Sequence, residues 1–250
     1  MTRATRSRNE QPAGWTQGRE RVMGIQLRIS LPDQPGALAR ITHTIARCGA
    51  DVLWVSVLES EGGRAIDEFG LRWPDGLHHQ PLLDALARER GVEILSCRHS
   101  RRLLDDHADL DLLSYLLTVP ERGLETLVDM APAALDADWA ELRAPARRLP
   151  VLYASADPPH DDIAPDGMPV RAIAGASGDV AWAQFPLPTL GSVLIIGRDD
   201  GPPFLRAEIR HAENVVLLAL RTLTSALGDG AGASELTSCL ASASAAQRTA

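Results

Sequence analysis

LPDQPGALARI, residues 31–41, is the stretch that decides the fold of the first part of the chain. An alternating apolar run ends here in a tight Pro-Asp-Gln-Pro-Gly segment, and a helical pattern follows at once. Pro32 and Pro35 stiffen the junction, because proline fixes φ and donates no hydrogen bond. Gly36 has no side chain at the point where the helix begins, so a ligand can approach the main chain closely.

The backbone amides at this junction point to a class of ligand. The first-turn amides, from Gly36 to about Leu38, have no acceptor inside the helix and carry partial positive charge, which attracts a carboxylate or a phosphate. The nearby carboxylate of Asp33 repels phosphate and accepts hydrogen bonds from an ammonium group. Amides beside a carboxylate are the pattern expected for a free amino acid. The alternative is that Asp33 caps the loop and that Pro-Gly is an ordinary strand-to-helix turn.

Apolar periodicity predicts a strand before this junction and a helix after it. The residues before it alternate from Ile25 to Leu31, which is typical of a half-buried strand. Apolar residues then recur at helical spacing, and Gly49 ends the helix in the usual C-terminal way. The residues expected to face inward from this helix are Leu38, Ile41, Ile45 and Cys48.

The following segments complete the order β-α-β-β-α-β. DVLWVSVLES (51–60) and RAIDEFGLRW (64–73) are predicted strands around a Glu-Gly-Gly turn, in which glycine supplies positive φ. PLLDALARERG (81–91) is a second helix, and VEILSCR (92–98) is a short last strand. The sequence thus predicts an α+β fold of ferredoxin-like type, with four antiparallel strands and both helices on one face. Residues expected to share one face of the second strand are Leu53, Val55 and Val57.

The junction resembles the opening of an ACT domain, the small regulatory module of amino-acid metabolism. That family has a strand, then Asp or Asn, any residue, Pro-Gly, a leucine two positions on, and a helix that ends in Gly before a second strand. Asp33, Pro35, Gly36 and Leu38 match these positions, and Gly49 before Asp51-Val52 matches the helix exit. Many relatives carry asparagine where this chain has Asp51. The resemblance covers residues 23–100.

The ACT resemblance implies a function and a quaternary structure. ACT domains usually work in pairs and hold a ligand between two copies, so one copy per chain implies a homodimer through this domain. The implied ligand is a small amino acid. The implied ligand-binding residues are Asp33, Gln34, Pro35, Gly36, Ala37, Leu38, Asp51 and Val52.

Residues 103–227 are predicted to form a second domain. Two helical patterns are followed by strand-like runs and by the long amphipathic helix 207–227. Phe185-Pro186-Leu187, the strand from Gly191 to Gly197, and Phe204 resemble the final third of a GAF domain, an α/β small-molecule sensor. The segment between Tyr153 and Val170 is short and rich in Pro and Asp. Two interpretations therefore remain: a GAF-like domain with a ligand pocket, and a GAF-like domain that serves only for dimerisation.

The composition limits which partners and cellular locations are expected. The net charge of −8 gives no electrostatic reason to expect a nucleic-acid partner. The three scattered cysteines form neither a disulfide framework nor a CxxC pair, and no apolar run reaches the ~18–20 residues of a membrane span. We expect a cytoplasmic protein without a membrane partner.

The two ends of the chain are expected to be disordered. Residues 1–22 hold five arginines and two glutamates, so a basic arm that binds nucleic acid is the alternative interpretation there. Residues 228–250 are rich in Gly, Ala and Ser. Met23 directly precedes the first strand and is an alternative translation start.

No motif points to catalysis. The cluster formed by Asp157, His160, Asp161 and Asp162 lies in a Pro-Pro setting that favours an exposed loop over a metal site. The glycine-rich run 228–232 follows a helix rather than a strand, so it lacks the context of a dinucleotide site. We therefore expect no enzyme, metal or cofactor. The leading hypothesis is an amino-acid-binding regulatory protein that signals by dimer rearrangement. An adaptor that dimerises and binds partners without a ligand is the main alternative, and an enzyme or DNA-binding regulator is the third.

Overall fold

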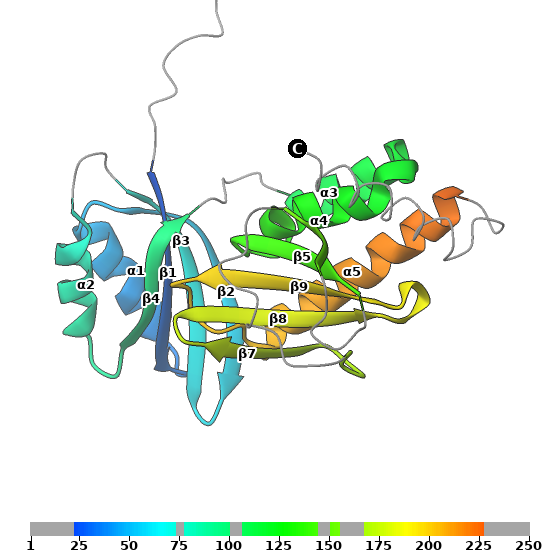
Figure 1. Cartoon of the computed structure of the whole chain (residues 1–250). Coiled ribbons are helices and arrows are strands. Elements are labelled where there is room, and N and C mark those ends of the chain that lie inside the picture. The colour runs from blue at the N-terminus through cyan, green and yellow to red at the C-terminus, as the bar shows by residue number, and fades with distance from the viewer. Residues whose placement is uncertain (1–22, 74–77, 101–106, 145–150, 156–167, 228–250) are drawn as a thin grey trace, which may run out of the picture.

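The computed structural model describes residues 23–73, 78–100, 107–144, 151–155 and 168–227. Within these ranges the chain has an α+β fold with two antiparallel sheets and five α-helices (Figure 1). None of the helices in the described ranges is long and apolar enough to cross a membrane. The interpretations placed on 1–22, 228–250 and the Asp157–Asp162 cluster lie outside the described residues.

Residues 23–100, called here the four-stranded unit, have the element order expected from the sequence. The sheet order is β2-β3-β1-β4 and every neighbouring pair is antiparallel, as in a ferredoxin-like unit. Gly62 and Gly63, at the tip of the hairpin between β2 and β3, have φ values of 62° and 76°, which suit a two-residue turn. The elements are β1 (Met23–Pro32), α1 (Ala37–Arg47), β2 (Asp51–Glu61), β3 (Arg64–Trp73), α2 (Gln80–Ala87) and β4 (Glu93–Ser100).

One face of this sheet and both helices form a hydrophobic core. The alternating residues of β1 pack there beside Phe69 and Leu71 of β3, all at most 2% exposed. Two details differ from the sequence-based expectation. Leu38 is 36% exposed, and the first turn of α1 buries Ala37 instead. In β2, register shifts near Leu53 and Leu58 break the alternation, and Val55 and Val57 of this edge strand are exposed.

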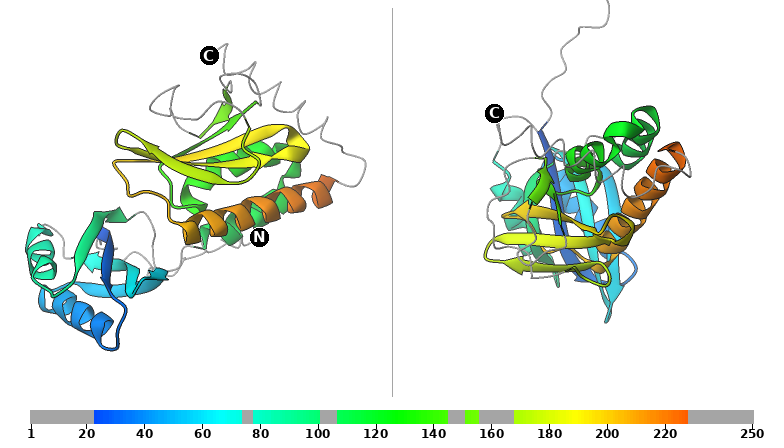
Figure 2. Two further views of the ribbon diagram at one scale, coloured as in Figure 1. Left: turned by 90° about the horizontal axis from the view of Figure 1, so that it is seen from below. Right: turned by 45° about the vertical axis from the view of Figure 1, so that its right-hand side comes forward.

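Residues 107–227, called here the five-stranded unit, form a second sheet with order β6-β5-β9-β8-β7. Helices α3, α4 and α5 pack with one face of this sheet into a separate core (Figure 2). The long helix α5 follows Phe204, as the sequence predicted. The elements are α3 (Ala108–Thr118), α4 (Gly123–Ala134), β5 (Trp139–Arg143), β6 (Val151–Ala154), β7 (Ile173–Ser177), β8 (Val180–Leu187), β9 (Ser192–Asp199) and α5 (Arg206–Leu227), with short 3₁₀ turns η1 (Pro120–Arg122) and η2 (Pro188–Leu190).

The two units meet through charged side chains. The polar face of β1 and β3 is the face opposite to α1 and α2. It lies against the start of α5 and the turn after α4. Arg28 of β1 is 1% exposed and donates to Oε1 of Glu68 in β3 at 2.7 Å and to Oε1 of Glu208 in α5 at 2.8 Å. A further bond joins Nη1 of Arg28 to the carbonyl oxygen of Pro203 at 3.3 Å. The guanidinium is therefore satisfied by both units.

A second arginine extends the network inside the five-stranded unit. Nη2 of Arg198 donates to Glu208 at 2.6 Å and to Oδ2 of Asp136 at 3.1 Å, while Asp136 also accepts from Gln26 and Arg98 of the four-stranded unit. Burial alone would raise the pKa of Glu208, but Arg198 and Arg28 outweigh it and hold that pKa below its ordinary value. Glu208 is thus an anion on which both units depend.

Replacing Arg28 tests this charged contact between the two units, called here the inter-unit junction. An Arg28→Met variant leaves the buried carboxylates of Glu68 and Glu208 short of a cation, so we expect a loss of about 3–5 kcal/mol in the free energy of unfolding by urea denaturation. Arg72→Met is the control on the same sheet, because Arg72 pairs with Asp51 at 3.1 Å in an exposed position, and such pairs contribute about 0–1 kcal/mol. Equal losses in the two variants would contradict a junction held by Arg28.

Candidate functional site

The loop between β1 and α1 presents free backbone donors. Gly36 adopts a left-handed conformation with φ of 84°, and α1 starts at the next residue without a side-chain cap. The Ala37 amide is used by the carbonyl of Gln34 at 3.1 Å. Among the described residues, no acceptor bonds the amides of Gly36, Leu38 or Ala39, and these residues are exposed. The start of α1 can therefore accept an anion from solvent.

Asp33 anchors this loop to the hairpin between β2 and β3. Its amide donates to the carbonyl of Gly63 at 2.9 Å, and its Oδ2 accepts from the hydroxyl of Ser60 at 2.6 Å. Asp33 therefore ties the loop to the hairpin and leaves the helix amides uncapped. Its other oxygen, Oδ1, accepts no hydrogen bond from the described residues. Gln34 and Pro35 lie exposed between Asp33 and Gly36.

A second carboxyl group, that of Asp67 in β3, lies close to this loop. Asp67 is 3% exposed, and no described residue donates a hydrogen bond to its buried Oδ1. Burial raises the pKa of Asp67, and the negative charge of Asp33 raises it further. Sequence reasoning missed this residue, although alternation along β3 puts Asp67 on the same face as Phe69 and Leu71. An acid on an otherwise apolar strand face was the available signal.

Asp51 and Val52 lie at the other end of the sheet. In β3, Arg64 pairs with Pro32 beside the loop, whereas Arg72 pairs with Asp51. Eight residues of extended strand separate these two positions, which corresponds to about 27 Å. Within one chain, Asp51 and Val52 therefore cannot contact a ligand that is bound at Asp33–Leu38.

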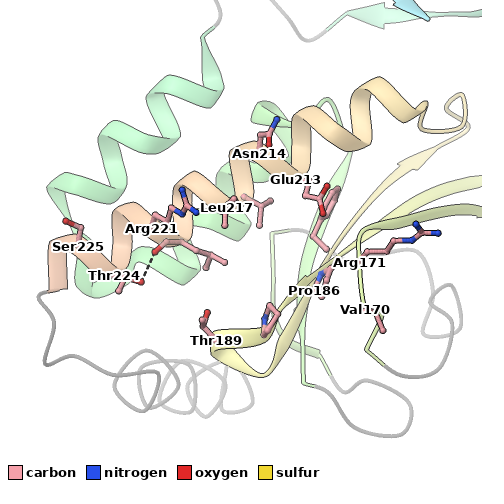
Figure 3. Close-up of a pocket in the computed structure, with 14 residues that line it drawn as sticks. Val170, Arg171, Pro186, Thr189, Glu213, Asn214, Leu217, Arg221, Thr224 and Ser225 are labelled. Carbon is pink, nitrogen blue, oxygen red and sulfur yellow. Dashed lines mark hydrogen bonds between the residues drawn. The ribbon is translucent and has the colours of Figure 1, made fainter.

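The five-stranded unit contains a pocket of about 860 Å³ between α5, β8 and η2 (Figure 3). Its apolar lining includes Phe185, Val216, Leu217 and Leu220. Its polar lining comes from α5, from Arg171 and from Thr189 of η2. Thr224, which also lines it, donates its hydroxyl to the carbonyl of Leu220 at 2.9 Å. This volume is in the range of small-molecule sites. In the described ranges, no three His, Cys, Asp or Glu side chains are placed to share a metal ion.

Comparison with known proteins leaves the family open. No protein-family model matches the chain, and no curated protein matches it. A formyltetrahydrofolate deformylase from Pseudomonas putida KT2440 is 15% identical over 38% of this chain and 38% of its own, with a TM-score of 0.28. An unknown protein from Galdieria sulphuraria is 10% identical over 80% of this chain and 91% of its own, with a TM-score of 0.29. The chain thus spans well under half the length of the deformylase, and neither likeness informs function.

Replacing Asp67 tests whether this buried carboxyl group lowers stability. A carboxyl group whose folded-state pKa is raised lowers stability as pH rises from the unfolded-state pKa through the folded-state pKa. An Asp67→Asn variant should therefore melt about 2–4 °C higher than the native chain at pH 7, which corresponds to roughly 1 kcal/mol. The gain should shrink as pH falls toward 3.8, the ordinary pKa of Asp. A pH-independent difference in melting temperature would show that the Asp67 charge is not responsible.

Proposed function

We propose that the protein is a non-catalytic regulatory protein that binds a small free amino acid at the start of α1, in an ACT-like domain, and signals by rearranging a homodimer. The observation that carries this proposal is the set of unpaired amides at Gly36, Leu38 and Ala39 beside the carboxyl groups of Asp33 and Asp67. A zwitterion needs both features. Its carboxylate accepts from the amides, and its ammonium group donates to the acids.

The expected affinity is modest. A charge-assisted hydrogen bond contributes about 1.5–3 kcal/mol, and two or three of them must also offset the immobilisation of the ligand. The resulting Kd lies between roughly micromolar and millimolar, which suits a sensor of a metabolite pool. The exposure of the loop supports easy entry, but it also leaves one side of the ligand uncovered.

A second copy of the chain would complete the site. A two-fold axis perpendicular to the strands would bring opposite ends of two equivalent sheets together, so that Asp51 and Val52 of the partner could approach the loop of the first copy. This arrangement accounts for the separation of about 27 Å within one chain. It also supplies the signal, because a ligand held by two copies favours the packing in which both contact it.

Paired glycine variants test the loop. Gly36 and Gly49, at opposite ends of α1, both have φ of 84° and open space where a Cβ atom would lie, so leucine at either position causes similar backbone strain. We expect Gly36→Leu to abolish amino-acid binding in calorimetry against the twenty amino acids, because its side chain covers the free amides. Gly49→Leu should bind like the native chain. Equal loss in both variants, or no heat from any amino acid with the native chain, would falsify the proposal.

The adaptor function remains the second candidate, because α3 and α5 expose large apolar side chains and contact each other. Leu110, Tyr115 and Leu117 of α3 and Leu217 and Leu218 of α5 are 45–63% exposed. Such side chains are typical of a surface that binds protein.

Sedimentation velocity with and without the bound amino acid separates the two functions. The sensor should shift from monomer toward dimer as the ligand is added, because a ligand that prefers the dimer stabilises it. The shift should be about tenfold in the dimer dissociation constant at saturation, or ~1.4 kcal/mol. An adaptor keeps the same dimer dissociation constant with and without the amino acid, and a Leu117→Glu change on α3 should raise that constant.

A further inference from the structure

A second cavity lies where the two units meet. Its volume is about 340 Å³, at the small end of the range for ligand sites. It is bounded by β2 and β3 of the four-stranded unit, by the turn after α4, and by the first turns of α5. Figure 2 shows the start of α5 facing that sheet, and the amide of Arg206 donates to Glu59 of β2 at 2.9 Å.

The charged groups that line this cavity are acidic. Glu68, Asp136 and Glu208 contribute carboxylates and His211 contributes an imidazole, whereas the three arginines of the junction do not line it. Two of the carboxylates are occupied by the junction. Both oxygens of Glu208 accept hydrogen bonds, and Asp136 accepts from two arginines. They therefore serve the junction rather than a ligand.

Glu68 differs from these two acids. Arg28 donates two hydrogen bonds to it, at 2.7 and 3.0 Å, and both reach Oε1. No described residue donates to Oε2, although Glu68 is only 4% exposed and lines the cavity. Oε2 is not one of the fully buried atoms that lack a partner, so it is open to the cavity. The cavity therefore contains a strong acceptor with unused capacity.

An aromatic wall lies beside this acceptor. Trp54 of β2 lines the cavity and pairs with Gly70 of β3, while its neighbour Ser56 pairs with Glu68. The Trp54 indole lies directly over Gly70, where a Cβ atom would come within 2.1 Å of Nε1. Glycine at position 70 thus lets the ring lie flat on the sheet. A tryptophan ring next to a carboxylate is a favourable environment for an ammonium group.

We propose that this inter-unit cavity binds a small organic amine with an apolar body. The ammonium group donates to Oε2 of Glu68, and the apolar part packs on Trp54 and on Leu135, which lines the opposite wall. The site is separate from the α1 loop, because Glu68 faces the five-stranded unit and the neighbouring Asp67 faces the core of the four-stranded unit. Changes at Glu68 and Ala207 leave the α1 loop unaltered, so the two proposals fail independently.

The test compares 2-phenylethylamine with 2-phenylethanol, its neutral counterpart, on the full chain by calorimetry and ligand-observed NMR. We expect the amine to bind saturably below about 10 mM and at least tenfold more tightly than the alcohol. Glu68→Gln keeps an acceptor for Arg28 and replaces Oε2 by a donor, so it should weaken amine binding by about tenfold or more. The matched control Glu93→Gln, at an exposed position of β4 in the same sheet, should bind like the native chain.

A cavity-filling variant makes the test independent of the buried charges. Ala207 of α5 lines the cavity, and Ala207→Phe should remove binding of the amine while the urea denaturation curve stays close to that of the native chain. The proposal is overturned if the amine and the alcohol bind equally, if Glu68→Gln binds the amine as the native chain does, or if Ala207→Phe retains full affinity. Absence of saturable binding to the native chain up to about 10 mM also overturns it.

Discussion

The constraint on which the arrangement of the two units depends is the burial of Arg28 between Glu68 and Glu208. Burial of a guanidinium is costly, and its attraction to carboxylates offsets this cost only when geometry and hydrogen bonding are good. Here Arg28 donates to both carboxylates and to the carbonyl of Pro203, so the cation is satisfied only when both units are in place. Burial disfavours the charged form of Arg28, but Glu208 and Glu68 keep its pKa raised above the ordinary value. Hydrophobic contact alone could hold the two surfaces in several relative positions, whereas this hydrogen-bond network is satisfied in only one of them.

Strand β3 connects the junction with the proposed amino-acid site. Successive side chains of a strand point to opposite faces, so Asp67 faces the core and the α1 loop while Glu68 faces the five-stranded unit. Asp67 and Glu68 are joined by one peptide bond, so an ammonium ligand that binds Asp67 would act on the backbone that positions Glu68. Coupling between sites requires an element with two arrangements that both sites bias. In this fold β3 is the shortest covalent path for such coupling, and the register shifts in β2 beside it give the sheet a place to adjust.

Local signals predicted the four-stranded unit well. The alternation of β1, the glycines of the hairpin and the stop at Gly49 each act over a few residues, and each is reproduced. The differences arise where contacts with distant parts of the chain determine which residues are buried. Leu38 is exposed because Ala37 fills the first-turn contact. Arg28 of β1, which by alternation alone would face solvent, is buried through contact with a helix residue 180 positions away. No periodicity in a single sequence reports that contact. Asp67 was detectable, because an acid on an apolar strand face contradicts the local pattern.

Hydrogen-bond satisfaction separates the structural charges of this protein from those proposed to bind ligands. Arg28, Arg198 and Glu208 have partners on every side, which is the condition under which buried ions stabilise a fold. Oδ1 of Asp67 is fully buried and has no donor among the described residues, whereas Oε2 of Glu68 also lacks such a donor but is open to the cavity. Local inconsistencies of this kind are expected at functional sites, where stability is exchanged for binding. Both atoms are carboxylate oxygens, and they lie on adjacent residues of one strand. A cationic nitrogen is the group that would satisfy either, which is why the two sites are assigned to ligands that carry an ammonium group.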